Sequence, residues 1–171
     1  MALRLLGEPP IDLHAGGVDL VFPHHENEVA QSEGATGKPF SRFWFHVEHL
    51  LIDREKMSKS LGNQFTVPDV LAQGLRASAL RYLLLSTHYR KQLMFSWENL
   101  KQAEEALRRI TDFLARLDQV RGGEAHPEIA ARVAAARRAF GEMIEADLNA
   151  AGGLGVMFEL VRGLNTAIDA G

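Results

Sequence analysis

The pattern of hydrophobic and polar positions changes character near residue 66. Before that point, short apolar runs alternate with glycine, proline and histidine, which favours strands and loops. After it, apolar residues recur every three or four positions almost to the end of the chain, which is typical of amphipathic helices. We therefore predict an α/β segment followed by an all-α segment.

Three elements and a loop are predicted in the first segment. A short buried strand is expected over residues 11–14, because this run follows two prolines and ends at a glycine pair. A helix is expected over residues 24–33, with its entry marked by Pro23. The aromatic and aliphatic residues of 43–52 predict a second strand, and the polar residues 53–63 predict a loop.

Five helices are predicted in the second segment. Thr66 and Ser96 can each cap a helix, because a side-chain oxygen there accepts a bond from an unpaired backbone N–H. Other helices are expected over residues 77–87 and near residues 157–168. The two longest helices each carry an apolar stripe, so we expect them to pack in a bundle. The stripes are Leu100, Ala103, Leu107, Ile110, Phe113, Leu114 and Leu117 in the first, and Ile129, Val133, Ala136, Phe140, Met143 and Leu148 in the second.

Composition limits the possible partners and chemistry. The chain has 171 residues and a formal net charge of −3, so a polyanion would have to meet a local basic patch. It has no cysteine, which excludes disulfides and thiolate metal ligands within this chain and fits a cytoplasmic protein. No apolar run reaches membrane-spanning length, and the first residues do not form a signal peptide.

A histidine- and glutamate-rich run at residues 22–28 is the first candidate for chemistry. On a helix, His24 and Glu28 share a face, so they could give two ligands to one zinc ion. His14 or His25 could add a third ligand, although we expect His25 to point elsewhere on the helix. The alternative is a surface helix with an ordinary histidine–glutamate pair.

Two loops are further candidates. Residues 56–63 contain two lysines and two serines, and mobile lysines suit the neutralisation of charge that grows on a triphosphate. A solvated charged loop is the alternative. Residues 12–19 contain a Gly-Gly pair after a strand end, which allows the close approach of a ligand, although an ordinary turn explains it equally.

Together these segments resemble the cysteinyl-tRNA synthetases, which are class I aminoacyl-tRNA synthetases. Residues 56–60 read Lys-Met-Ser-Lys-Ser, the second signature of that class. Residues 12–28 are similar to the segment that carries zinc ligands in the cysteinyl-tRNA synthetases. Residues 86–90 and 147–149 are similar to later segments of the same enzymes. The resemblance runs over essentially the whole chain in the order of the family.

The resemblance implies a partial Rossmann-type catalytic domain followed by an α-helical bundle. It also implies a cysteine–tRNA ligase: cysteine reacts with ATP, used with magnesium, to give cysteinyl-adenylate, and the cysteinyl group then passes to tRNA(Cys). In the family a zinc ion holds the substrate thiolate and so selects cysteine over serine. The implied divisions are residues 1–65 for the end of the catalytic domain, 66–95 for stem-contact helices and 96–171 for the tRNA-binding bundle.

The family pattern also implies a role for individual residues. His24 and Glu28 take two zinc-ligand positions, and His14 falls beside the amino-acid pocket. Lys56 and Lys59 are the expected catalytic lysines. The expected ATP-binding loop consists of Lys56, Met57, Ser58, Lys59 and Ser60.

The chain departs from the family in what it lacks. The other two zinc ligands of the family are cysteines, and its first signature, His-Ile-Gly-His or a variant, is absent from this sequence. We therefore expect half a zinc site and part of a nucleotide site, inactive in the isolated chain and completed by an N-terminal synthetase half. The intact family is expected to be monomeric and cytoplasmic.

Two other functions remain open. The chain could be a stand-alone, non-catalytic paralogue that holds tRNA or a protein partner. It could also belong to the related ligase that joins cysteine to glucosaminyl-inositol. Cysteine-dependent exchange between ATP and pyrophosphate would distinguish a catalytic protein from a binding module. Replacing tRNA by the amino sugar in a transfer assay would distinguish the two ligases.

Overall fold

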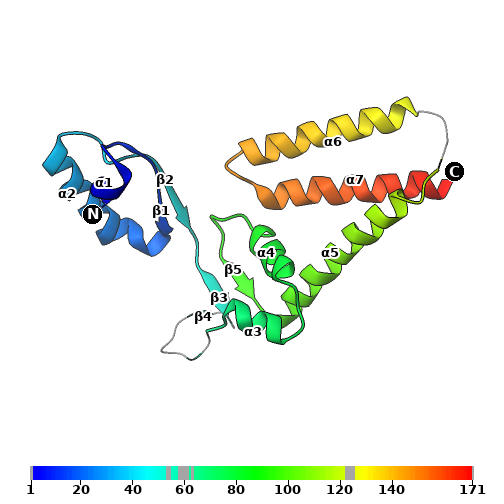
Figure 1. Ribbon diagram of the computed structural model, residues 1–171, viewed down its shortest axis with the longest axis horizontal. Coiled ribbons are helices and arrows are strands. Elements are labelled where there is room, and N and C mark those ends of the chain that lie inside the picture. Colours follow the sequence, from blue (N-terminus) through cyan, green and yellow to red (C-terminus); the bar gives the residue numbers. More distant parts are fainter. Residues whose placement is uncertain (1, 53–54, 58–61, 63, 122–125, 171) are drawn as a thin grey trace. The chain divides into compact units, whose positions relative to one another are not determined.

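The computed structural model describes residues 2–52, 55–57, 62, 64–121 and 126–170. These residues form two compact units, and each is described by itself. The first consists of Met1–Leu50 and Tyr89–Leu93, and the second of Leu51–His88 and Met94–Gly171. Figure 1 labels their helices and strands.

The first unit is built on a β–α–β arrangement. Strands β1 (Ile11–Gly17) and β2 (Ser41–Val47) pair in parallel, and helix α2 (Glu26–Thr36) connects them. Two turns of irregular helix, η1 (Val18–Leu20) and η2 (Val21–His25), lead from β1 into α2. Parallel strands need such a crossover because the chain must return to the same end of the sheet. This confirms the predicted α/β layout of the first segment.

The two faces of the β1–β2 sheet differ in character. Side chains alternate between faces along a strand, so His14 and its partner Trp44 lie on one face, while Leu13 and its partner Phe43 lie on the other. Leu13 is 58% exposed and Phe43 is 67% exposed. The first unit therefore leaves part of an apolar sheet face open to solvent, although Ile11 on the same face is buried and Phe45 packs against Tyr89.

The second unit is helical and also holds most of a small sheet. That sheet has the order β4 (Glu55–Lys56), β3 (Leu50–Ile52) and β5 (Leu93–Phe95), with β3 and β4 antiparallel. The helices are α3 (Val67–Ala72), α4 (Ala77–Leu85), α5 (Trp97–Leu117), α6 (Pro127–Glu145) and α7 (Ala150–Ala170). Among the described residues no helix combines the length and the apolar character needed to cross a bilayer.

The two predicted helix caps are present. The Thr66 hydroxyl accepts a bond from the Asp69 N–H, and the Asp69 carboxylate accepts one from the Thr66 N–H at 2.7 Å. The Thr66 hydroxyl also donates to the Asp69 carboxylate at 2.7 Å, and this bond, with the one from the Thr66 N–H, lowers the pKa of Asp69 because both favour its charged form. Ser96 accepts a bond from the Asn99 N–H at 3.0 Å. Both caps satisfy N–H groups that the first helical turn leaves unpaired, as the sequence predicts.

The apolar stripe of α5 is buried over only part of its length. Leu100, Ala103 and Phe113 are at most 7% exposed, whereas Leu114 and Leu117 are 53% and 38% exposed. Helices α6 and α7 lie side by side as an antiparallel hairpin (Figure 1). The predicted helical character of this segment is therefore confirmed, with its main core near the first half of α5. The predicted packing of the two striped helices is not, because α5 packs chiefly on α4 and α6 on α7.

Several predicted boundaries were wrong. Residues 43–52 form two strands instead of one, because the chain leaves the first sheet at Val47 and enters the second at Leu50. The polar run 53–63, predicted as a loop, contains strand β4, whose residues pair with β3. The last helix begins at Ala150, well before residue 157. Strand β5 and a short helix α1 (Ala2–Leu6) were not predicted.

The connection from α6 to α7 is a tight turn. Asp147 and Leu148 have φ values of 57° and 54°, a left-handed conformation that a leucine rarely adopts. The side-chain oxygen of Asn149 then accepts a bond from the Gly152 N–H at 2.9 Å and so caps α7. A Cβ at Gly152 would lie 2.7 Å from both the Asn149 amide nitrogen and Met143 Sδ, so any larger residue there would displace the cap and press on α6.

Because of this cap, substituting alanine for Gly152 and for Gly155 of α7 should change the stability of the protein by different amounts. Gly155 is exposed and a Cβ there meets nothing within 4 Å, so Gly155→Ala should stabilise the helix by up to about 1 kcal/mol. Gly152→Ala gains the same helix propensity but displaces the Asn149 cap, which is worth about 1 kcal/mol. Urea denaturation should therefore rank Gly155→Ala above Gly152→Ala by about 1 kcal/mol. Equal stabilities would contradict the role of the cap.

The open apolar face predicts unequal stability of the two units. Amide hydrogen exchange followed by mass spectrometry should show faster exchange in β1 and β2 than in the first half of α5, because a two-stranded sheet with one partly exposed apolar face is held weakly. A thermal circular dichroism melt should accordingly be broad. A single sharp transition at high temperature, with equal protection throughout, would contradict this.

Candidate metal centre

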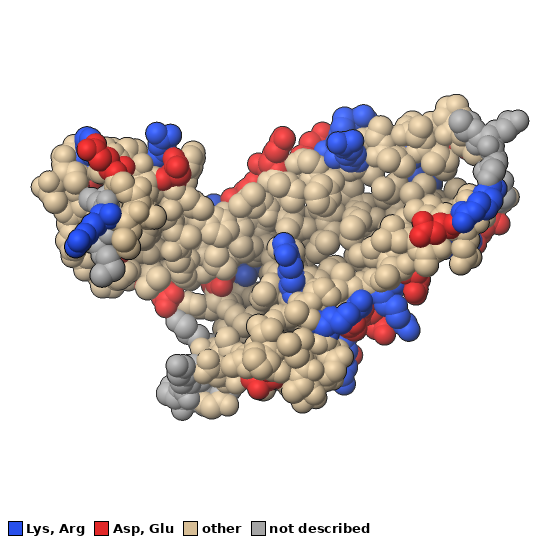
Figure 2. Space-filling model, in the orientation of Figure 1, with Lys and Arg blue, Asp and Glu red and all other residues tan. Residues whose placement is uncertain are grey.

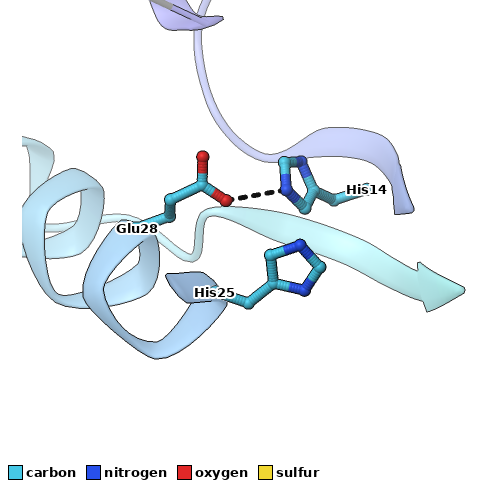
Figure 3. Close-up of side chains that lie close together, drawn as sticks. All are labelled: His14, His25 and Glu28. Atoms are coloured by element: carbon cyan, nitrogen blue, oxygen red, sulfur yellow. Dashed lines mark ion pairs between the residues drawn. The ribbon is translucent and has the colours of Figure 1, made fainter. Parts of the chain in front are cut away.

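Side chains from three elements converge on the polar face of the β1–β2 sheet. His14 comes from β1, and Trp44 and His46 come from β2, where residues two apart share a face. His25 ends the turn before α2, and Glu28 follows in the first turn of that helix. Figure 3 shows His14 and Glu28 facing each other with His25 beside them.

Glu28 lies between two imidazoles. Its Oε2 atom is 2.8 Å from His14 Nε2, and its Oε1 atom is 3.7 Å from His24 Nε2. His24 and Glu28 are four residues apart and share a helix face, as the sequence predicts. The side chain of His24 is 60% exposed, whereas that of His14 is 21% exposed. The carboxylate thus has one sheltered and one open neighbour.

The geometry at Glu28 fits a bound cation. Among the described residues, Glu28 Oε2 is the buried side-chain atom without a hydrogen-bond donor in good alignment, even though His14 Nε2 is 2.8 Å away. A short distance without alignment does not satisfy a buried oxygen, and such an oxygen costs about 1–3 kcal/mol. Donor atoms of His14, His25 and Glu28 lie within 4.8 Å of one another. Imidazole nitrogen and carboxylate oxygen are ligands that zinc accepts.

His25 lies inside this group, contrary to our expectation that it points elsewhere. The turn that holds His25 has helical backbone and runs directly into α2, so His25 and Glu28, three residues apart, lie on neighbouring positions of one face. It is 4% exposed, and its Nδ1 atom is 2.8 Å from His46 Nε2. Burial lowers the pKa of His25, and the neighbouring imidazoles of His14 and His46 lower it further.

The predicted ATP loop is described only at its start. Lys56 pairs through its backbone with Leu51 of the adjacent strand, and Met57 follows that strand. Ser58, Lys59 and Ser60 lie outside the described residues. The assignment of these residues to ATP therefore stays a prediction from the sequence.

Two residues of the site were missed by sequence reasoning, namely Trp44 and His46. Their rings are nearly parallel, with centroids 6.1 Å apart, and each also approaches His25. Their alternation along β2 is a signal that places them on one face. Identifying that face as the polar one required the parallel register with His14, which the sequence does not supply.

The chain matches one protein family and many relatives. Residues 1–105 match the family described as tRNA synthetases class I (C) catalytic domain. A cysteine–tRNA ligase of Solibacter usitatus is 51% identical over all of this chain, which covers 37% of that protein. A cysteine–tRNA ligase of Chlamydia trachomatis serovar D is 47% identical over 99% of this chain and 36% of its own length. The chain thus spans little more than a third of these curated relatives.

Solved structures support the same fold. The Mycobacterium tuberculosis methionyl-tRNA synthetase bound by methionyl-adenylate aligns with a TM-score of 0.67 at 23% identity, over 94% of this chain and 34% of that one. A ternary complex of an Agrobacterium radiobacter K84 LeuRS with tRNA aligns with a TM-score of 0.67 at 21% identity, over 92% of this chain and 22% of that one. At these identities the likeness shows the fold alone.

Proposed function

This chain belongs to the family of class I (C) tRNA synthetases, and we propose that it forms part of a cysteine–tRNA ligase. The intact enzyme would activate cysteine with ATP and magnesium and transfer it to tRNA(Cys). The observation that carries the proposal is 51% identity to a cysteine–tRNA ligase across the whole chain. Because the chain covers 37% of that relative, a complementary N-terminal half would supply the rest of the active site.

We assign His24 and Glu28 to the metal side of this site. The buried oxygen of Glu28 supports the assignment of Glu28, since a cation would satisfy it. That oxygen faces His14, 2.8 Å away, and the donor atoms grouped with it belong to His14 and His25, so the role of His24 rests on the family resemblance. His14 would stand beside the amino-acid pocket. Zinc, when bound, would favour a substrate thiolate over a hydroxyl and so select cysteine over serine. Two ligands hold zinc weakly, so full affinity would need the complementary half.

We assign Lys56 and Lys59 to ATP. Adenylate formation increases the charge on the phosphates, and lysines brought close at that moment lower the barrier. The antiparallel pairing of Lys56 with Leu51 supports this in part, because it gives the loop of residues 56–60 a fixed starting point.

We assign tRNA contacts to the second half of the chain. Residues 1–65 would end the catalytic domain, residues 66–95 would meet the tRNA stem, and residues 96–171 would form the tRNA-binding bundle. Figure 2 shows basic and acidic side chains interspersed on the visible face. Arginines such as Arg76 and Arg108 are paired with glutamates, so RNA phosphates would have to replace those carboxylates. The completed enzyme would work in the cytoplasm, where ATP and tRNA are available, as a monomer.

Exchange of labelled pyrophosphate into ATP tests the catalytic assignment. The chain alone should show no cysteine-dependent exchange, whereas the chain completed with the remaining sequence of the Solibacter usitatus relative should show it. Lys59→Ala should then lower the exchange rate by about 10²–10³-fold, the loss expected when one group that stabilises transition-state charge is removed.

Lys38→Ala is the control, because Lys38 is exposed and pairs with Glu8. A folded, completed protein without exchange that still binds tRNA would favour a non-catalytic tRNA-binding module. Exchange followed by transfer to glucosaminyl-inositol in place of tRNA would favour the other ligase.

Metal binding tests the role of Glu28. Competition for zinc against an indicator dye, with the chain itself, should show an affinity loss of at least about tenfold for Glu28→Gln, since even changes outside the ligand shell cost 10- to 100-fold. Glu26→Gln is the matched control, because Glu26 lies on the same helix and is exposed. Equal affinities for the two variants would remove Glu28 from the metal site.

A further inference from the structure

Helix α2 has little apolar anchoring for a helix that carries one proposed metal ligand, Glu28, and directly follows the other, His24. None of its residues, Glu26–Thr36, is buried. At its carboxyl end, the Glu33 carboxylate accepts a bond from the Phe40 N–H at 3.0 Å. At its amino end no side chain caps the first turn. Polar contacts at the two ends therefore have to fix the helix against the sheet.

The contact at the amino end is the imidazole pair of His25 and His46. The Nδ1 atom of His25 and the Nε2 atom of His46 are 2.8 Å apart, so one ring donates and the other accepts. Among the described residues, His25 is the buried polar side chain, and neither the proposed metal site nor the proposed ATP site includes it. A buried polar group of this kind holds a defined position because losing its partner is costly.

The ring of His25 is also held against the other strand. A Cβ at Gly16 of β1 would lie 2.8 Å from His25 Cε1 and 3.0 Å from its Nε2. The ring lies 5.2 Å from the Trp44 ring of β2, centroid to centroid. His25 thus touches both strands at the point where the chain enters α2.

Packing alone does not lock this ring in place. A cavity of about 190 Å³ adjoins it, lined by Val21, His25, Glu26, Val29, Trp44 and His46. A ring beside open volume can shift unless a directional bond holds it. The hydrogen bond to His46 is therefore the contact that defines where His25 sits.

We propose that His25 and His46 form a positioning pair that sets the first turn of α2, and with it the placement of His24 and Glu28 against the sheet. The metal part of this inference rests on the proposed function. Neither His25 nor His46 needs to touch the metal or the substrate for this role. The pair acts as an outer support, of the kind that orients metal ligands in other sites.

Two substitutions of His25 distinguish the effect of its hydrogen bond to His46 from the effect of its ring volume. His25→Phe keeps the ring volume and loses the bond, whereas His25→Asn keeps a polar atom at the Nδ1 position. In the metal-free chain, His25→Phe should speed amide exchange in the first turns of α2 by about 3- to 10-fold, the effect expected from one lost hydrogen bond. His25→Asn should exchange more slowly than His25→Phe. In the zinc competition assay, His25→Phe should weaken binding by about 10- to 100-fold.

A second pair of variants tests the contact between the His25 ring and strand β1. A Cβ at Gly16 would crowd the His25 ring, and also the Leu20 side chain at 2.9 Å, so Gly16→Ala should disturb the bond to His46 and change both assays in the same direction as His25→Phe. Gly34→Ala is the matched control, since a Cβ at Gly34 of α2 meets nothing within 4 Å. It should leave zinc affinity unchanged and should not speed the exchange of the first turns, because alanine favours the helix.

The outcomes separate this inference from the proposed function. Unchanged exchange in His25→Phe and Gly16→Ala overturns the positioning pair. Equal exchange in His25→Asn and His25→Phe overturns the role of the bond in favour of ring packing. If exchange responds as expected but the unmodified chain binds no zinc, the positioning pair stands and the metal assignment within this chain fails.

Discussion

The parallel pairing of β1 with β2 is the constraint on which the candidate site depends. Its register sets His14 opposite Trp44 and Gly16 opposite His46. The rings of His14, Trp44 and His46 therefore lie on one face, beside the position where Gly16 has no side chain. The crossover between parallel strands has to pass over a face of the sheet, and here it carries α2. Glu28 and His25 approach His14 and His46 only because that helix lies over that face.

The opposite sheet face explains why the first unit is incomplete as a folding unit. Leu13 and Phe43 pair across the strands yet remain largely exposed. Parallel sheets are normally covered on both faces and contain more than two strands. The relatives of this chain are nearly three times as long, so they have sequence available to cover such a face. Stability and completion of the proposed active site would then come from the same added segment.

Local signals were predictable from the sequence, and long-range ones were not. The caps at Thr66 and Ser96 depend on residues three positions away, so the sequence alone indicates them. The division of residues 43–52 into two strands depends on partners that are distant in the chain, so a single apolar run concealed it. The same holds for His46, whose role follows from contact with His25, 21 residues earlier. The roles of the loop lysines still rest on the resemblance alone.

A site fixed by polar contacts differs from one fixed by apolar packing. Apolar burial is non-directional, so it stabilises a helix without setting the direction of each side chain. Hydrogen bonds weaken steeply when they bend, so the His25–His46 and Glu33–Phe40 bonds hold the two ends of α2 in defined positions. Such a design requires that every buried polar atom has a partner. Among the described residues, Glu28 Oε2 is the buried side-chain atom that has no aligned donor, and this is the position where a cation would complete the network.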